Sequence, residues 1–399
     1  PGPAVALTAH YDSVGAGPGA GDDGIGVATM LEIARQLKAA LPKLRHPLLL
    51  LITDGEETGL LGARLFVDQH RWAPEVRAAV NLEARGNQGP SFMFETGSRN
   101  AEAMSRYPVR MSRLITNSIY YTAYKRLPND TDFTVFKAAG WQGYNFALTV
   151  NVQHYHTPLD RIANLSLDSL QHHGDNAAAV LEALTRSRDT ESDPASAELE
   201  GEAVYVDLLA TRLLQWPVSL AIPMAAGSAL LGIALFASVL HRRGLPLAGL
   251  LKSVGLAMFA MLLAALATHL LLMSLRGLAA IPPLAARYRW TAYPLPLDVA
   301  MVALTTLALL LTAALHGRIT LIAWWAAIGL LLVLATLASA VLLPGLSFAV
   351  QLPLLALVLA AVPLAWPTRI DTQICLRISL MAATVTAVLV VVPTLGFLH

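Results

Sequence analysis

The stretch Ala9-His10-Tyr11-Asp12-Ser13 decides the fold, together with the turn Gly19-Ala20-Gly21-Asp22-Asp23-Gly24 that follows it. The histidine ends a short apolar segment, residues 4–9, which is typical of a strand buried on both faces. After the turn, apolar side chains recur at helical spacing over residues 27–37. A histidine and paired aspartates between a buried strand and a helix indicate a metal site at the edge of a sheet.

The same pattern repeats along the first half of the chain. Further strands are predicted at Pro47–Thr53, Ala78–Leu82 and Gly143–Leu148, and helices at Leu60–Gln69 and Leu167–Thr185. This alternation predicts an α/β fold, with a mostly parallel mixed sheet flanked by helices. Ligands in such sheets gather at the carboxyl ends of the strands. His10, Glu56, Glu57 and Glu83 each follow a predicted strand closely.

Composition divides the chain into unlike parts. Charged residues make up 14% of the sequence, against roughly 25% in ordinary soluble domains, and the deficit lies after residue 210. Residues 187–207 are rich in acidic side chains and have few apolar ones, which is typical of a solvated linker. We therefore expect an α/β domain over 1–187, an acidic linker over 188–212 and a transmembrane domain over 213–399.

Long apolar runs fill the last part of the chain. Each is near or above the ~18 residues that indicate a bilayer-spanning helix, so we expect an all-α transmembrane bundle of about six helices in a lipid bilayer. Lys252 is expected to snorkel and His269 to be packed or hydrogen-bonded. The runs are roughly 217–240, 247–275, 296–315, 319–343, 347–366 and 378–398.

The loops between these runs predict the orientation of a multi-pass membrane protein. Basic residues are more numerous in the loops opposite the α/β domain than in those on its own side. By the positive-inside rule the α/β domain lies on the non-cytoplasmic side, whether periplasmic, extracellular or lumenal. The two sets are Arg242, Arg243, Arg318, Arg369 and Arg377, against Arg276, Arg287 and Arg289.

Net charge and cysteine content argue against nucleic-acid binding, an internal disulfide and a thiolate metal site. The formal net charge of +1 gives no field that would favour nucleic acid. The single cysteine, Cys375, excludes an internal disulfide and a thiolate metal cluster. A metal must therefore bind to histidine and carboxylate. No signal peptide precedes the first strand, and we expect Pro1 to be a cut rather than a natural start.

Zinc accepts imidazole nitrogen and carboxylate oxygen, and two zinc ions that share one carboxylate need at least five protein ligands. Spacing alone does not choose between His154 and His156, because both would point the same way from a strand. Asp23 is a candidate helix cap. Five residues are candidate ligands: His10, Asp22, Glu57, Glu83 and His156.

These fragments resemble the M28 family of zinc metallopeptidases, over about residues 4–187. The matching fragments are His10-Tyr11-Asp12-Ser13, Gly21-Asp22-Asp23-Gly24, Glu56-Glu57-Thr58-Gly59, Leu82-Glu83 and His156-Thr157-Pro158-Leu159-Asp160. The resemblance implies a zinc exopeptidase-like fold and two Zn²⁺ ions. A glutamate at position 83 is more similar to the membrane-bound relatives than to the plain bacterial aminopeptidases, which have aspartate there.

The resemblance also implies a role for each residue. His10 and Glu83 would bind one zinc, His156 and Glu57 the other, and Asp22 would bridge them across a cis Asp22–Asp23 peptide. Glu56 would be the general base, because its neighbour binds metal while it stays free to take a proton from water. Three further residues are expected to support the site: Asp12 beside His10, Asp160, and Asp132, for which a helix cap is the competing interpretation.

The resulting hypothesis is a membrane-anchored exopeptidase that hydrolyses peptides, within that class an aminopeptidase. A carboxypeptidase would need a cation for the substrate carboxylate, for which Arg85 or Arg99 are candidates. A glutaminyl cyclase would use one zinc, and a silent membrane scaffold would have lost ligands. His172 and His173 are expected to be solvated.

Overall fold

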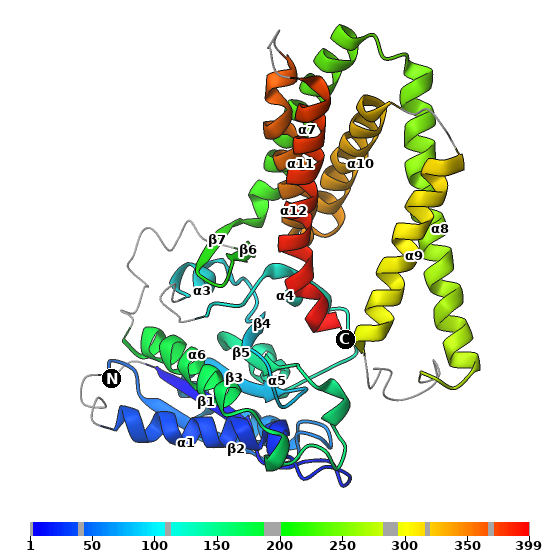
Figure 1. Ribbon diagram of the computed structural model, residues 1–399. Coiled ribbons are helices and arrows are strands. Elements are labelled where there is room, and N and C mark those ends of the chain that lie inside the picture. Colours follow the sequence, from blue (N-terminus) through cyan, green and yellow to red (C-terminus); the bar gives the residue numbers. More distant parts are fainter. Residues whose placement is uncertain are drawn as a thin grey trace. The chain divides into compact units, whose positions relative to one another are not determined.

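The chain folds into two units, Pro1–Val218 and Ser219–His399, seen in a computed structural model (Figure 1). The structure describes residues 3–38, 44–107, 113–186, 201–281, 294–315, 320–365 and 371–398. Each unit has its own hydrophobic core.

In the described part of the first unit, five strands form one sheet in the order β2-β1-β3-β5-β4 (Figure 1). Four of the strands are parallel and β4 is antiparallel to β5. The expected mixed, mostly parallel sheet is therefore confirmed. The bounds are β1 (Ala4–His10), β2 (Leu48–Thr53), β3 (Val76–Ala84), β4 (Phe92–Thr96) and β5 (Gln142–Leu148).

Helices cover both faces of this sheet. On one face α1 (Gly26–Leu37) and α6 (Leu167–Arg186) bury Met30, Ile33 and Val180 against the strands, with α3 (Ala101–Arg106) and α4 (Ser118–Tyr124) beside them. On the other face α2 (Leu61–Gln69) and α5 (Asp132–Ala138) bury Phe66, Phe133 and Phe136. A fully buried side chain of this size contributes about 1.5–3 kcal/mol.

This topology brings three strand ends to one edge of the sheet. β1 ends at His10, β2 ends at Thr53, and β3 carries Glu83 one residue before its end. Because β2, β1 and β3 are parallel neighbours, the segments that follow them start side by side. The carboxyl edge therefore positions His10, Glu83 and the loop that carries Glu56 and Glu57.

The expected linker over 188–212 differs from the structure in its second part. Residues 187–200 lie outside the described residues, but β6 (Ala203–Leu208) and β7 (Arg212–Pro217) form an antiparallel hairpin within the first unit. Tyr205 is fully buried in its core, and the Ala203 amide donates to Asn100 Oδ1 at 2.8 Å. Residues 203–206 are apolar and buried, so this part of the segment is ordered. The acidic composition of the segment as a whole predicted a solvated linker instead.

The second unit consists of apolar helices. Among the described residues, five are long and apolar enough to cross a membrane: Val218–Arg243, Leu247–Gly277, Leu321–Leu342, Phe348–Ala365 and Thr372–Val390. They contain α7 (Ala221–Arg243), α8 (Leu247–Gly277), α10 (Leu321–Leu342), α11 (Phe348–Ala361) and most of α12 (Thr372–Leu398). In α9 (Pro294–Leu315) the apolar stretch Val299–Thr312 is shorter.

Close approach and neutral hydrogen bonds hold this unit together. A Cβ on Gly329 of α10 would lie 2.2 Å from the Phe236 ring of α7, so these helices pack closely. Gln351 Nε2 donates to Ser228 Oγ at 2.9 Å, between α11 and α7. The expectation that His269 is packed is wrong, because its side chain is exposed on α8.

Candidate metal centre

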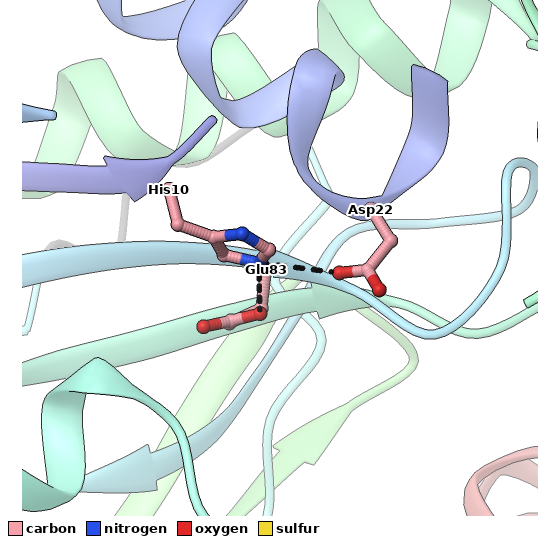
Figure 2. A group of neighbouring side chains, drawn as sticks. All are labelled: His10, Asp22 and Glu83. Carbon is pink, nitrogen blue, oxygen red and sulfur yellow. Dashed lines mark ion pairs between the residues drawn. The ribbon is translucent and has the colours of Figure 1, made fainter. Parts of the chain in front are cut away.

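His10 is the first candidate ligand, and its two ring nitrogens have different partners. Nδ1 lies 3.0 Å from the backbone carbonyl oxygen of Asp12. Because a carbonyl only accepts, Nδ1 carries the hydrogen and Nε2 is left to bind a metal. Nε2 lies 3.3 Å from Asp22 Oδ1 and 3.8 Å from Glu83 Oε2 (Figure 2).

Asp22 faces two histidines with its two carboxylate oxygens. Oδ1 faces His10, while Oδ2 lies 3.0 Å from His156 Nε2. The same His156 nitrogen lies 2.8 Å from Glu57 Oε1. The Asp22–Asp23 peptide is cis. Among the described residues, two groups of possible ligand atoms result, each lying within 4.8 Å of one another: His10, Asp22 and Glu83, and Asp22, Glu57 and His156.

Asp160 fixes the turn that carries Asp22. Its two carboxylate oxygens accept from the backbone N–H groups of Gly21, at 2.7 Å, and Asp22, at 3.0 Å. A Cβ on Gly21 would lie 2.6 Å from Asp160 Oδ1, so glycine is required at this position. Asp160 therefore holds the turn that carries Asp22, although the two aspartates lie far apart in the sequence.

Asp12 supports the site in a different way from the one expected. Its backbone carbonyl, rather than its carboxylate, is the near partner of His10, since Asp12 Oδ1 lies 3.5 Å from Nδ1. The carboxylate oxygens accept instead from the backbone N–H groups of Glu56, at 3.1 Å, and Glu57, at 3.2 Å. Asp12 thus connects the end of β1 to the loop after β2.

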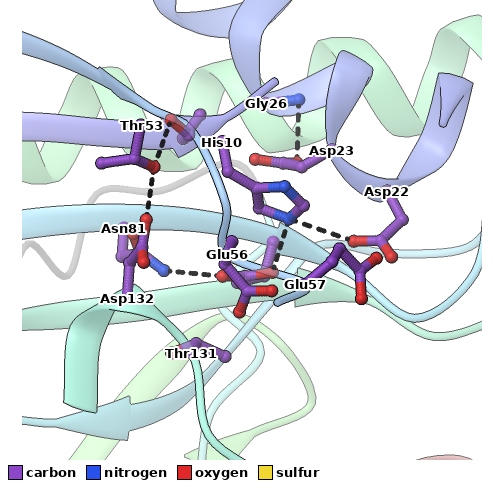
Figure 3. A network of polar contacts seen from close by, with 12 residues as sticks. His10, Asp22, Asp23, Gly26, Thr53, Glu56, Glu57, Asn81, Thr131 and Asp132 are labelled. Carbon is purple, nitrogen blue, oxygen red and sulfur yellow. Dashed lines mark hydrogen bonds and ion pairs between the residues drawn. The ribbon is translucent and has the colours of Figure 1, made fainter. Parts of the chain in front are cut away.

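Glu56 lies beside the ligand groups and belongs to neither of them (Figure 3). Burial, together with the negative charges of Asp132, Asp22 and Glu57, raises its pKa to about 8, although His10 opposes the shift. A carboxyl group with a pKa near neutrality is suited to general acid–base work.

Asp132 and Thr53 lie to one side of Glu56. Thr53 Oγ1 donates to Asp132 Oδ2 (Figure 3). Burial raises the pKa of Asp132, and the bond from Thr53 opposes the shift. Asp132 is also the first residue of α5, so the cap interpretation fits its place, but Thr131 makes the capping contacts.

The buried carboxylates of the site would be stabilised by a bound cation. Burial lowers the pKa of His10, but the hydrogen bond that its ring donates to Asp22 and the charge of Glu83 outweigh this and raise the pKa to about 12. Burial raises the pKa of Glu83 and of Glu57. Carboxylates crowded together out of water repel one another unless positive charge lies between them. Imidazole nitrogens and carboxylate oxygens are ligands that zinc accepts, so the residues fit that metal.

The structure distinguishes His156, which belongs to a group of possible ligands, from His154, which does not. His154 Nδ1 lies 2.8 Å from Asn87 Nδ2, and His154 belongs to neither group of possible ligands. The segment is not a strand: Val152–His154 is a helical turn, and His156 has a φ of 60°. A left-handed backbone conformation is uncommon at residues other than glycine, and such residues cluster at functional sites. It directs His156 toward Asp22.

Sequence reasoning placed one pair of histidines wrongly and overlooked some neighbours of the ligands. His172 and His173 are buried in α6 rather than solvated, and His173 Nδ1 lies 2.8 Å from Ser91 Oγ. The Tyr155 ring stacks on His156 with centroids 3.6 Å apart, and Arg85 Cζ lies 5.8 Å from the Tyr155 ring centroid. The place of Tyr155 directly before a candidate ligand was the available signal.

Comparison with known proteins agrees with this geometry. Residues 2–181 match the model described as Peptidase family M28. The chain is 32% identical over 217 residues to Endoplasmic reticulum metallopeptidase 1 of Mus musculus, a match covering 54% of this chain and 24% of that protein. It is 32% identical over 214 residues to the Vacuolar membrane protease of Lachancea thermotolerans, covering 52% and 21%. The chain thus spans about a quarter of the length of these relatives.

Among solved structures, the chain is similar to an aminopeptidase from Aneurinibacillus sp. strain AM-1. The identity is 22% and the TM-score is 0.38, over 49% of this chain and 46% of that one. The LapA aminopeptidase of Legionella pneumophila gives 21% identity and a TM-score of 0.37, over 47% and 51%.

Proposed function

We propose that this chain is a membrane-anchored two-zinc exopeptidase, and within that class an aminopeptidase, because residues 2–181 match the model of peptidase family M28. The observation that carries the proposal is the pair of ligand groups that share Asp22. His10 and Glu83 would hold one zinc, Glu57 and His156 the other, and Asp22 would bridge them. The relatives named as metallopeptidases are consistent with this class.

The two zinc ions, when bound, would supply a Lewis acid for the peptide carbonyl and a water of lowered pKa. Glu56 is the chain's own acid–base group. It accepts a proton from the attacking water and later donates it to the departing amine. Burial and the neighbouring carboxylates raise the pKa of Glu56, and the Asp12 carboxylate holds the backbone that carries it.

The test uses the full chain in detergent with short unblocked peptides. We expect release of single amino-terminal residues, loss of activity on chelation and recovery when zinc is restored. Glu56→Gln is expected to lower turnover by about 10²–10⁴-fold while the metal content is unchanged. Activity that survives complete metal removal would refute the proposal.

One observation favours carboxypeptidase activity as a second candidate. Arg85 lies over the Tyr155 ring, which itself stacks on His156, so a cation lies near the candidate centre. Arginine is well suited to binding a substrate carboxylate. Peptides with an acetylated amino terminus would be cleaved by a carboxypeptidase and not by an aminopeptidase, whereas carboxyl-terminal amidation has the reverse effect.

Metal stoichiometry tests the remaining alternatives. A glutaminyl cyclase of the same fold would bind one zinc, and a silent scaffold would bind none. All five candidate ligands are present and lie together in two groups, which favours binding of two ions. Elemental analysis of the purified chain distinguishes these three cases.

We also propose that the second unit anchors the peptidase in a bilayer, with the first unit on the non-cytoplasmic side. The five apolar helices support the anchor, and the excess of arginine in alternate loops supports the orientation. The endoplasmic-reticulum and vacuolar-membrane names of the relatives agree with an internal-membrane or export route. Protease accessibility of the first unit in sealed membrane vesicles of known orientation is the test.

A further inference from the structure

A row of polar side chains crosses the sheet next to the candidate ligands. Its members occupy directly paired positions on β1, β3, β5 and β4, and each is at most 1% exposed. They are Thr8, Asn81, Asn145 and Glu95. Since side chains two residues apart share a face of a strand, Thr8 lies beneath His10, and Asn81 lies beneath Glu83. The polar row therefore adjoins the row of metal ligands.

Hydrogen bonds join the row from end to end. Asn81 Nδ2 donates to Glu83 Oε1 and to Asn145 Oδ1, each at 3.1 Å. Asn145 Nδ2 donates in turn to Glu95 Oε2 at 3.1 Å. At the outer end, Lys137 Nζ of α5 donates to Glu95 Oε1. At the inner end, the Thr8 hydroxyl donates to Asn81 Oδ1. A continuous path thus runs from Lys137 to Glu83.

Glu95 sets the direction of these bonds. An ionised carboxylate only accepts. Burial raises the pKa of Glu95, and the Lys137 ammonium and the Asn145 amide oppose this by stabilising the ionised form. Asn145 must then turn its amide nitrogen toward Glu95 and its oxygen toward Asn81. Asn81 must in turn present its nitrogen to Asn145, and the second hydrogen on that nitrogen points at Glu83. The Asn81 side chain is therefore held as a donor to Glu83.

This donor separates the two oxygens of Glu83. Oε1 is occupied by Asn81, whereas Oε2 faces His10 Nε2. Buried polar groups are costly on a face otherwise packed with Ala79, Phe133 and Phe136. If the polar row only stabilised the sheet, the hydrogen bond from Asn81 to the Glu83 carboxylate would not be needed.

We propose that Asn81, oriented through Asn145 by the Glu95–Lys137 pair, is a positioning residue that presents Oε2 of Glu83 to the metal on the His10 side. The inference rests on the proposed two-metal function. It also gives a purpose to a buried ion pair that the hydrolytic chemistry does not use.

The experiment measures metal affinity rather than turnover. The full chain in detergent is stripped with a chelator and titrated with Zn²⁺ and with Co²⁺, whose absorption spectrum reports ligand geometry. In Asn81→Ala, one of the two ions is expected to bind about 10–100-fold more weakly, with a changed Co²⁺ spectrum, while the other ion is unaffected. Asn145→Ala should show a smaller loss in the same direction, because it acts through Asn81.

Asn100→Ala is the matched control. Asn100 is fully buried, donates to Thr96 Oγ1 at 2.8 Å and accepts from the Ala203 amide at 2.8 Å. Its loss should lower the unfolding temperature comparably and leave both metal affinities unchanged. Equal metal binding by Asn81→Ala, Asn100→Ala and the parent chain overturns this inference alone. A parent chain that binds fewer than two ions contradicts the two-metal centre, and this inference with it.

Discussion

The two units of the chain bury different kinds of polar side chain. In the first unit, ionisable groups such as His10, Asp22, Glu83 and Glu95 lie out of water at the sheet. In the second, the buried polar side chains among the described residues are neutral, such as Ser228, Gln351 and Ser379. Burying a charge costs several kcal/mol unless a partner offsets it, whereas neutral hydrogen bonds between apolar helices contribute modestly to packing. The first unit therefore buries ionisable side chains at its candidate site, whereas the described part of the second unit buries only neutral polar side chains.

Among the candidate ligands and their supporting residues, the largest effect on peptidase activity is expected from Asp22→Ala, which removes the carboxylate shared by both ligand groups. We expect binding of both zinc ions to weaken and hydrolysis to fall by at least about 10²–10³-fold. Zinc content and initial rates on short peptides are the measurements. Glu32→Ala, which removes an exposed acid on α1, is the control and should change neither. Two tightly bound ions in Asp22→Ala would break the assignment of the bridge.

Asp12→Ala is expected to have the next largest effect. It removes the acceptor for the Glu56 and Glu57 amides but keeps the backbone carbonyl that binds His10. Activity should fall by about 10–100-fold, with zinc retained on the His10 side. Asp12→Asn keeps one acceptor oxygen, so its loss should be smaller. Activity of Asp12→Ala equal to that of the parent chain would show that the loop needs no such support.

The sequence predicted the strand ends and the candidate ligands because each ligand follows an apolar run, and parallel strands bring such positions to one edge. His10 and Glu83 are the clearest cases, since period and topology suffice to place them. His156 was harder, because its left-handed φ of 60° is set by the packing of the segment 149–160 and not by strand periodicity.

Features that depend on contacts distant in sequence escaped prediction. His172 and His173 are polar residues on an amphipathic helix, and their burial depends on Ser91, about eighty positions away. Acidic neighbours mask the strand pattern of the hairpin over 203–217. Its burial comes from packing against the hydrophobic core of the first unit. The Asn81–Asn145–Glu95 row requires the register of three strands, which no local pattern specifies.

A third prediction concerns pH and is expected to act through stability. Burial lowers the pKa of His173 to about 3, below its value of about 6.5 in an unfolded chain. Below pH 6.5 the unfolded chain therefore binds a proton that the folded chain does not, and stability falls as pH falls. Between pH 7 and pH 5 the loss is about 2 kcal/mol.

His173→Gln removes this titration and keeps a polar partner for Ser91. We expect its thermal unfolding midpoint in detergent to depend less on pH between 7 and 5 than that of the parent chain. Peptidase activity after incubation at pH 5 should decline more slowly. Parallel pH profiles for the two proteins would show that His173 is not buried in its neutral form.

The smallest effect on peptidase activity is expected from Gly329→Ala in the second unit. The added Cβ would lie 2.2 Å from the Phe236 ring, so α7 and α10 must separate, at a cost of about 1–3 kcal/mol. Gly227→Ala on α7 is the matched control, since a Cβ there meets nothing within 4 Å and alanine favours the helix. Gly329→Ala should lower the unfolding midpoint of the bundle while zinc content and initial rates stay at parent values. A fall in zinc content in Gly329→Ala, but not in Gly227→Ala, would show that the metal centre depends on the packing of the apolar helices, and the separation of roles between the units would fail.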